Sequence, residues 1–434
     1  MRLNRFSIVA VSLLTSISFI ACGDSSSSSS DNNLTTEIKE VIDSNISLDA
    51  KNDSDNNLSI VKDEITNKGY KIQPYLRVAE LDGNWSKVPD IATKIAEYIH
   101  NNDESITLKF PTNWVIAGAE GDLASEDILG LPFQVDENRT EKIKVVELCN
   151  KKYAKMAVET GNFHSSALPC QVSIHSENDK VYIDILDPEA IFTLFFYDLT
   201  DEQKVGLKQV ALDVKKEVKD MIYASLENSK ITELNQQMGP QYNETQFETL
   251  HKQRPFKVIN YSNNGKEFSI ADLKTISAKI IEKLGDEANP SNVAGLSEGS
   301  SWRSARAEGI PIPNSQVVEA CSPKYAKMAT SLGSQYATSL PCEIAITRKN
   351  DDNKTLQISY INPTYMFNIM FGKDALNNLS DSKKVQFEKL PDTVFQDLKL
   401  IVSSAINELK NENLELTENI PEFSNSNDTP PSPF

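Results

Sequence analysis

The sequence has no hydrophobic run long enough to cross a membrane near its N-terminus. The apolar stretch there runs from Ile8 to Ile20, about 13 residues interrupted by Ser and Thr, and follows Arg2 and Arg5. A membrane-spanning helix needs roughly 17 to 25 mostly apolar residues. A short apolar stretch behind basic residues is instead typical of a cleaved signal peptide, which we place at residues 1–21.

Basic residues are scarce relative to acidic ones. The chain carries 44 Lys and Arg against 62 Asp and Glu, which gives a formal net charge of −18. Such a surplus of negative charge repels the phosphate backbone of nucleic acids. We therefore expect no nucleic-acid partner.

Histidine and cysteine, which serve most often in catalytic and metal sites, are also few, with 4 and 5 residues. The segment Gly295-Leu-Ser-Glu-Gly299 fits the nucleophile-elbow pattern of hydrolases, but all four histidines precede it, whereas that pattern places histidine after serine. No Cys-x-x-Cys spacing is present, and His164 is Tyr336 in the repeat described below, so a zinc site lacks ligands. We predict no catalytic residue, no metal and no cofactor.

The apolar stretch ends in Phe19-Ile-Ala-Cys22, which resembles the lipobox of bacterial lipoproteins, where a cysteine takes a diacylglycerol. The alternative is an ordinary signal peptide cut near Ala21. The lipoprotein is favoured because residues 22–57, rich in Ser, Asn and Asp, cannot bury enough apolar surface to fold and suit a tether. We expect lipidation at Cys22, a membrane partner through that anchor, and a place in the bacterial cell envelope facing the periplasm, with the outer membrane favoured over the inner.

Most of the remaining chain is a duplication. Residues 145–174 align with residues 317–346 at a constant offset of 172, without a gap and with 15 identities in 30 positions. The shared segments are Val-Val-Glu-x-Cys, Lys-Tyr-Ala-Lys-Met-Ala and Leu-Pro-Cys. We predict two homologous domains, the first copy at residues 72–228 and the second copy at residues 254–412, separated by a linker at 229–253 and followed by a disordered tail at 413–434.

Hydrophobic periodicity predicts an α+β fold in each copy. Alternating apolar residues indicate strands at residues 142–148, 171–175 and 181–186. Asp187-Pro188 and Asn362-Pro363 combine an N-cap residue with proline at the first helical position, so each begins a helix. A long amphipathic helix closes each copy. Because strands and helices do not alternate regularly, we predict an antiparallel sheet with helices packed on one side.

These motifs resemble the domain of unknown function 302 family. The resemblance rests on the segments shared by the two copies, on Gly309-Ile-Pro311 with its looser counterpart Gly130-Leu-Pro132, and on Asn362-Pro363, and it covers about 60 residues of each copy. The first copy departs from the pattern by carrying Asp187 in place of Asn362. The resemblance implies an α+β domain that occurs singly or in tandem. It implies no activity and no catalytic residue.

The cysteines other than Cys22 form one pair in each copy, 21 positions apart. In an oxidising periplasm such pairs usually form disulfides. We therefore predict that Cys149 pairs with Cys170 and that Cys321 pairs with Cys342. Two alternatives stay open, a pair of buried free thiols and a redox-active pair.

The function class favoured by the sequence is a non-catalytic binding or interaction module of the cell envelope, with an unknown ligand or envelope protein as partner. The alternative is a periplasmic thiol-redox protein or enzyme that uses the paired cysteines. We expect the two copies to pack with pseudo-twofold symmetry. Because ligands often bind at domain junctions, the loops from Gly118 to Pro132 and from Gly295 to Pro313 are the predicted recognition loops.

Overall fold

The computed structural model describes residues 73–102, 114–116, 133–136, 139–168, 170–196, 199–241, 255–286, 288–304, 310–312, 314–340, 342–377, 379–412 and 414–419. The predicted signal peptide, Cys22, the tether and the loop from Gly118 to Pro132 lie outside these residues. Within the part that is described, no helix combines the length and the hydropathy needed to cross a membrane.

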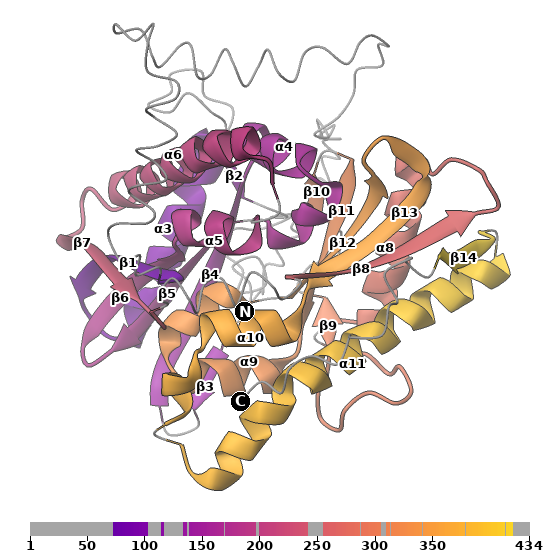
Figure 1. Cartoon of the computed structure of the whole chain (residues 1–434). Helices are drawn as coiled ribbons and strands as arrows, with labels where there is room; N and C mark the ends of the chain where they lie inside the picture. The colour runs from indigo at the N-terminus through magenta and orange to yellow at the C-terminus, as the bar shows by residue number, and fades with distance from the viewer. Residues whose placement is uncertain are drawn as a thin grey trace, which may run out of the picture.

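The first copy is an antiparallel sheet with helices against one face (Figure 1). Its strands are β1 (Tyr75–Asp82), β2 (Trp114–Ile116), β3 (Phe133–Asp136), β4 (Arg139–Asn150), β5 (Cys170–Glu177), β6 (Lys180–Leu186) and β7 (Ile231–Met238). Its helices are η1 (Trp85–Lys87), α3 (Val88–Asn102), α4 (Lys151–Glu159), η2 (Asn162–Ala167), α5 (Pro188–Phe195) and α6 (Asp201–Ser225). The strands lie in the order β2-β4-β5-β6-β1-β7, and β3 pairs with β4.

The second copy repeats the strands and the α-helices of the first in the same order. Its strands are β8 (Phe256–Asn263), β9 (Arg303–Ser304), β10 (Ile310–Ile312), β11 (Ser315–Cys321), β12 (Cys342–Lys349), β13 (Asp352–Ile361) and β14 (Leu416–Asn419). Its helices are α8 (Ile270–Leu284), α9 (Pro323–Thr330), η3 (Ser334–Ser339), α10 (Pro363–Met370), η4 (Lys373–Leu376) and α11 (Asp381–Glu412). The order β10-β11-β12-β13-β8-β14, with β9 beside β11, matches that of the first sheet. The α+β class, the antiparallel sheets and the duplication predicted from the sequence are confirmed.

The short helices α5 and α10 begin where their sequences predict. The side chain of Asp187 accepts a hydrogen bond from the backbone N–H of Glu189 at 3.1 Å, and Asn362 accepts one from Thr364 at 3.2 Å. The following proline occupies the first helical turn in both, where its missing N–H leaves no hydrogen bond unmade. These caps satisfy N–H groups that the helix itself cannot.

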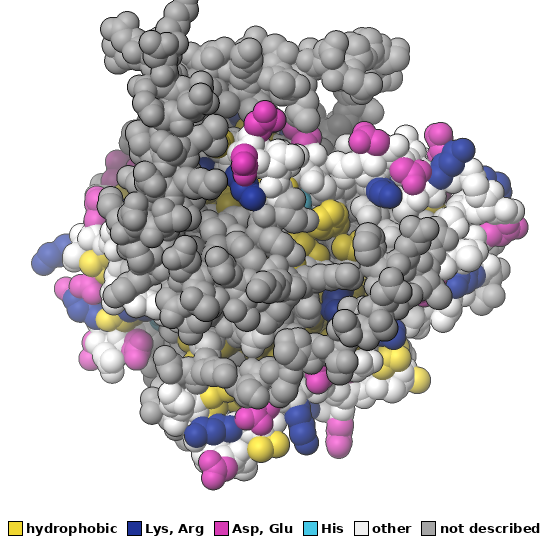
Figure 2. Space-filling view, in the orientation of Figure 1, with side chains coloured by type: hydrophobic (Ala, Val, Ile, Leu, Met, Phe, Trp, Pro, Cys, Tyr) yellow, Lys and Arg dark blue, Asp and Glu magenta, His cyan; other side chains and the backbone are white. Residues whose placement is uncertain are grey.

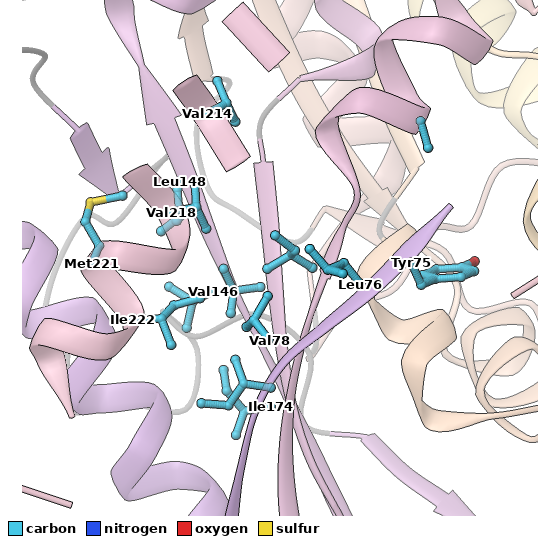
Figure 3. Close-up of a cluster of buried hydrophobic side chains, with 14 of the residues drawn as sticks. Tyr75, Leu76, Val78, Val146, Leu148, Ile174, Val214, Val218, Met221 and Ile222 are labelled. Atoms are coloured by element: carbon cyan, nitrogen blue, oxygen red, sulfur yellow. The ribbon is translucent and has the colours of Figure 1, made fainter. Parts of the chain in front are cut away.

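The helix-covered face of the first sheet forms an apolar core (Figure 3). Val146 and Leu148 of β4, Ile174 of β5, and Val214 and Val218 of α6 belong to one buried cluster (Figure 3), and all five side chains are at most 3% exposed. Alternation along the strands sends every second side chain into this core. The intervening side chains therefore lie on the other face of the sheet, which the described helices of the same copy do not cover.

Two strands lie where the sequence analysis placed non-domain segments. Strand β7 falls in the predicted linker and pairs with β1, and β14 falls in the predicted tail and pairs with β8. Both are edge strands with polar sequences, ITELNQQM and LTEN. Because an edge strand gains its stability from backbone pairing more than from apolar burial, hydrophobic periodicity does not detect it.

The chain leaves the first sheet in contact with the second copy. Pro240 lies two residues after the end of β7, and a Cβ atom placed on Gly372 would lie 2.6 Å from the Cβ atom of Pro240. Gly372 also has a φ of +63°, a conformation that side chains with a Cβ rarely adopt. Glycine at this position thus permits the close approach of the connecting segment to the end of α10.

The described part of the surface carries charges of both signs. Figure 2 shows Lys and Arg side chains next to Asp and Glu side chains around the rim of the face that it presents. Several are ion pairs along or between helices, such as Lys216 with Asp220 on α6 and Lys279 with Glu408 between α8 and α11. Exposed pairs of this kind add little stability but keep the acidic chain from presenting one continuous charge on this face.

Candidate functional site

The two copies contact each other reciprocally through the sheet faces that their own helices leave uncovered. Helix η2 of the first copy lies on β12 and β13 of the second, and η3 of the second copy lies on β5 and β6 of the first. Likewise α4 contacts β10, and α9 contacts β3, which lie beside each other in Figure 1. Each contact thus has a counterpart made by the equivalent elements with the copies exchanged.

Polar groups tie the two copies together at several points. The Asn162 amide donates to the carbonyl of Arg348 at 2.7 Å, and Asn350 accepts from the backbone N–H of Asn162 at 2.6 Å. The hydroxyls of Tyr75 and Ser339 lie 2.7 Å apart, and Figure 3 shows Tyr75 on the side of β1 away from the helix-covered core. The first copy therefore presents a mixture of polar and aromatic groups to the second.

Aromatic rings fill the space between these polar contacts. Tyr75 meets Tyr336 edge to face at 5.3 Å between ring centroids, and Phe195 of α5 meets Tyr365 of α10 at 5.7 Å. The hydroxyl of Tyr365 donates to the carbonyl of Leu194. Helix α10 of the second copy therefore contributes to the core cluster of the first copy, and Phe367 packs against the core clusters of both.

A cavity of about 70 Å³ lies at this junction. The first copy contributes Ala167, Gln171, Leu186, Ile191 and Phe195 to its wall, and the second copy contributes residues of β11, β12, α9 and α10 together with Trp302. Most of the wall is apolar or aromatic. The volume suffices for a few water molecules or one small molecule, and it is well below the size of a typical drug-binding pocket.

Polar groups reach this cavity at a few places. The side-chain amide of Gln171 donates to Oε1 of Glu343 at 3.0 Å, so that one residue from each copy forms the pair. The thiols of Cys321 and Cys342 also line the cavity. The cavity therefore combines an apolar wall with a small polar patch that both copies build.

The four described cysteines, Cys149, Cys170, Cys321 and Cys342, form no disulfide in the structure. Leu148 lies directly opposite Cys170, so these two side chains are on the same face of the sheet. The side chain of Cys149, the next residue of β4, is therefore on the other face. The same holds in the second copy, where Ala320 lies opposite Cys342. In this register each pair would need a local rearrangement at the strand ends before it could oxidise. The disulfides between Cys149 and Cys170 and between Cys321 and Cys342 stay predictions.

Burial makes these thiols weaker acids than an exposed cysteine. It raises the pKa of Cys170 and of Cys342 to about 12, and it also raises the pKa of Cys321. Since the thiolate is the nucleophile in thiol chemistry, these three groups are protonated and inert at neutral pH in this conformation.

Each copy also holds a buried carboxylate between an indole and a phenol. In the first copy, Trp114 Nε1 donates to Glu217 at 2.6 Å and the Tyr153 hydroxyl donates to the other carboxylate oxygen at 2.8 Å. The second copy repeats this arrangement with Trp302, Tyr325 and Asp397, at 2.8 and 3.1 Å. We call these the Trp–carboxylate–Tyr triads. They join the long closing helix to the end of the sheet.

Sequence analysis missed both triads. The two tryptophans are 188 positions apart and the two carboxylates 180, whereas the gapless alignment has an offset of 172. Insertions between these segments therefore hid the equivalence. One signal was available: Tyr153 and Tyr325 belong to the shared Lys-Tyr-Ala-Lys motif, and a buried tyrosine hydroxyl requires a hydrogen-bond partner.

The Gly-x-Ser-x-Gly segment belongs to the second triad. Both the backbone N–H and the hydroxyl of Ser297 donate to Oδ1 of Asp397, at 2.9 and 3.0 Å. Among the described residues no histidine takes part in this arrangement, so they offer Ser297 no general base of the kind that hydrolases use. Within the predicted loop from Gly295 to Pro313, Ser297 and Trp302 are thus held against α11, and Trp302 is 1% exposed.

One polar cluster is confined to the first copy. Arg77 donates to both carboxylate oxygens of Asp184 at 2.9 and 3.2 Å, and Nε2 of His175 lies 3.6 Å from the same carboxylate. His175 and Asp184 are fully buried, and burial lowers the pKa of His175. The second copy has Lys257, Thr347 and Ser359 at the equivalent positions, so the cluster is no shared catalytic feature. Among the described residues, no group of three or more potential metal ligands converges.

We predict that Asp397→Asn destabilises the protein by about 2 kcal/mol, because the change weakens hydrogen bonds to a buried carboxylate. Glu217→Gln should act in the same direction in the first copy. Urea unfolding measures the effect, with Asp392→Asn, an exposed position on the same helix, as the control. Equal stability of the Asp397 and Asp392 variants would show that the triad contributes nothing.

Acid should destabilise the protein through His164. This side chain is 1% exposed, and its ring packs at a tilt against Phe196 with 4.3 Å between the ring centroids. Burial lowers its pKa to about 3. In the unfolded chain histidine takes up a proton near pH 6.5, so stability is lost as the pH falls from about 6.5 towards 3, by about 1.4 kcal/mol per pH unit.

The second copy has Tyr336 in the place of His164, at 4.5 Å from Phe371. His164→Tyr should therefore reduce the stability lost between pH 7 and pH 4.5 by about 2 to 3 kcal/mol. The reverse exchange, Tyr336→His, should increase that loss. Urea unfolding at the two pH values tests both variants, and parallel pH profiles of variant and parent would contradict the assignment.

Comparison with known proteins agrees with this duplicated architecture. The family described as "Domain of unknown function DUF302" matches residues 133–225 and 273–394, one segment in each copy. The crystal structure of an uncharacterized conserved DUF302 protein from Bacillus stearothermophilus is similar over 37% of this chain and 100% of its own, with 14% identity and a TM-score of 0.24. None of the curated proteins matches. The family motifs recognised in the sequence thus recur in both matched segments, and the chain belongs to the DUF302 family with two copies of its domain.

Proposed function

We propose that this protein is a non-catalytic binding module of the bacterial cell envelope, with a small and largely apolar ligand in the cavity between its two copies. The observation that carries the proposal is the cavity itself, since both copies build its wall. Junctions between domains are favoured ligand sites. An apolar wall with one polar patch suits a small molecule with an apolar body and one hydrogen-bonding group.

The features repeated in both copies support binding over catalysis. Within the described residues, the Trp–carboxylate–Tyr triads and the stacked Phe192–Phe196 and Phe367–Phe371 pairs occur twice, and all of them hold helices in place. The Arg77–Asp184–His175 cluster, which contains groups used in acid–base chemistry, occurs in one copy. A duplicated enzyme would be expected to repeat such a cluster unless one copy had lost activity.

Pseudo-twofold packing of the copies forms part of the proposal. The reciprocal contacts of η2 with the second sheet and of η3 with the first support it. In a pair related by a twofold axis, every contact occurs twice: where a helix of one partner contacts a strand of the other, the equivalent strand of the first contacts the equivalent helix of the second.

The cell-envelope setting is proposed from the N-terminal sequence. The lipobox-like segment ending at Cys22 would provide a lipid anchor in the membrane, at the outer membrane in preference to the inner, and the tether would hold the two copies in the periplasm. The net charge of −18 argues against a nucleic-acid partner.

A ligand in the cavity predicts a specific effect of filling it. Ala329 of α9 lines the cavity and is 2% exposed, so Ala329→Leu should exclude the ligand. Native mass spectrometry of the protein released from its own envelope should show a bound small molecule in the parent and in Ala271→Leu, an exposed control on α8, but none in Ala329→Leu. A parent protein without any bound molecule would contradict the proposal.

A thiol-redox function is the second candidate, because Cys321 and Cys342 line the same cavity. The raised pKa values of these thiols argue against it. The binding proposal predicts that thiol reagents label the folded protein slowly at pH 7 and that mild reductants and oxidants do not cycle the cysteines. Peptide mapping without reduction would identify any disulfide, and a readily cycling pair would favour the redox function.

A further inference from the structure

The contact between Gln171 and Glu343 joins equivalent positions of the two copies. The residues are 172 positions apart, the offset of the duplication, and each is the second residue of its strand, β5 or β12. The amide of Gln171 donates to Glu343 at 3.0 Å, and the two residues are 4% and 7% exposed. If two identical copies packed in this way, the residue at this position would contact the same residue of the other copy.

The neighbouring strand places a second carboxylate beside each member of this contact. Glu147 of β4 lies directly opposite Gln171, and Glu319 of β11 lies directly opposite Glu343. All four side chains are buried. Residues directly opposite in an antiparallel pair share a face, so the first copy presents one carboxylate and one amide here, whereas the second presents two carboxylates.

The same face carries the contacts between the copies. Val145, two residues before Glu147, packs with Ala326, Ala337 and Leu340 of the second copy. Val317, two residues before Glu319, packs with Ala154 and Val158 of the first. Because side chains two apart on a strand point the same way, the carboxylates of Glu147 and Glu319 face the junction as well.

We propose that the two faces are specific for each other, and that the pair of Gln171 and Glu343 is the residue contact that selects the mixed pair over a pair of second copies. A pair of second copies, from two separate chains, would gather four carboxylates at the junction without the amide that donates to Glu343. Buried like charges disfavour such an assembly. The partner that the face of the second copy fits is therefore the first copy, and the two halves of the chain are not interchangeable.

This inference is separate from ligand binding, because it concerns which surfaces assemble and not what the cavity holds. It predicts that the effect of a carboxylate on stability depends on which of the two copies carries it. Adding a carboxylate to the first copy should weaken the junction, and removing one from the second copy should not.

The test uses three variants of the full chain. Gln171→Glu should lower the melting temperature at pH 7.5 by about 5 °C or more, and the difference should shrink at pH 5, because carboxylates held close together take up protons more readily. Glu343→Gln should match the parent or exceed its stability. The double variant Gln171→Glu with Glu343→Gln restores one amide and one carboxylate, so it should recover most of the loss.

A fourth variant and a second measurement separate repulsion from other effects. Gln171→Met removes the hydrogen bond without adding charge, so its loss should be the same at both pH values. Hydrogen exchange of residues 162–167 and 334–339, the helices η2 and η3, should speed up in Gln171→Glu if the junction opens. An unchanged Gln171→Glu variant at pH 7.5, or a double variant no more stable than Gln171→Glu, would overturn the proposal.

Discussion

The constraint on which this structure depends is that the described helices of each copy cover one face of its own sheet and leave the other face to the partner copy. The strands alternate, so half of their side chains point away from those helices. In the first copy these include Val145, Gln171 and Tyr75, which are buried. Their burial comes from the other copy, through η3 and α9, and the second sheet is covered by η2 and α4 in return. Each copy thus buries the sheet face that the helices of the other copy leave uncovered.

The Trp–carboxylate–Tyr triads fix the helices that cover each sheet relative to the end of that sheet, close to the junction. A carboxylate in the middle of α6 or α11 accepts from a tryptophan at the end of the sheet and from a tyrosine of the following short helix. The long helix, the sheet end and the short helix are therefore fixed to one point. In the second copy, Trp302 and Tyr325 also line the cavity, so the same point determines part of its shape.

The sequence predicts what periodicity and repetition encode. The duplication, the central strands, the caps at Asp187 and Asn362, and the family motifs all follow from local patterns. The edge strands β7 and β14 do not, because backbone pairing leaves no hydrophobic signature in ITELNQQM or LTEN. The triads and the contact of Gln171 with Glu343 join residues more than 60 positions apart, and such contacts depend on how the copies dock. The equal spacing of the cysteines predicted that the two thiols of each copy lie close together. The strand register, which places neighbouring residues on opposite faces of the sheet, appears only in the paired strands.

The close approach of Pro240 to Gly372 has a kinetic consequence. The segment that connects the copies already touches the second copy where it leaves the first sheet, so the two halves meet within one molecule. A covalent connection sets a local concentration that does not fall on dilution. Assembly of the shared cavity is therefore a first-order event, independent of how many molecules a cell makes. A binding site built by two separate chains would instead be lost as the protein became scarce.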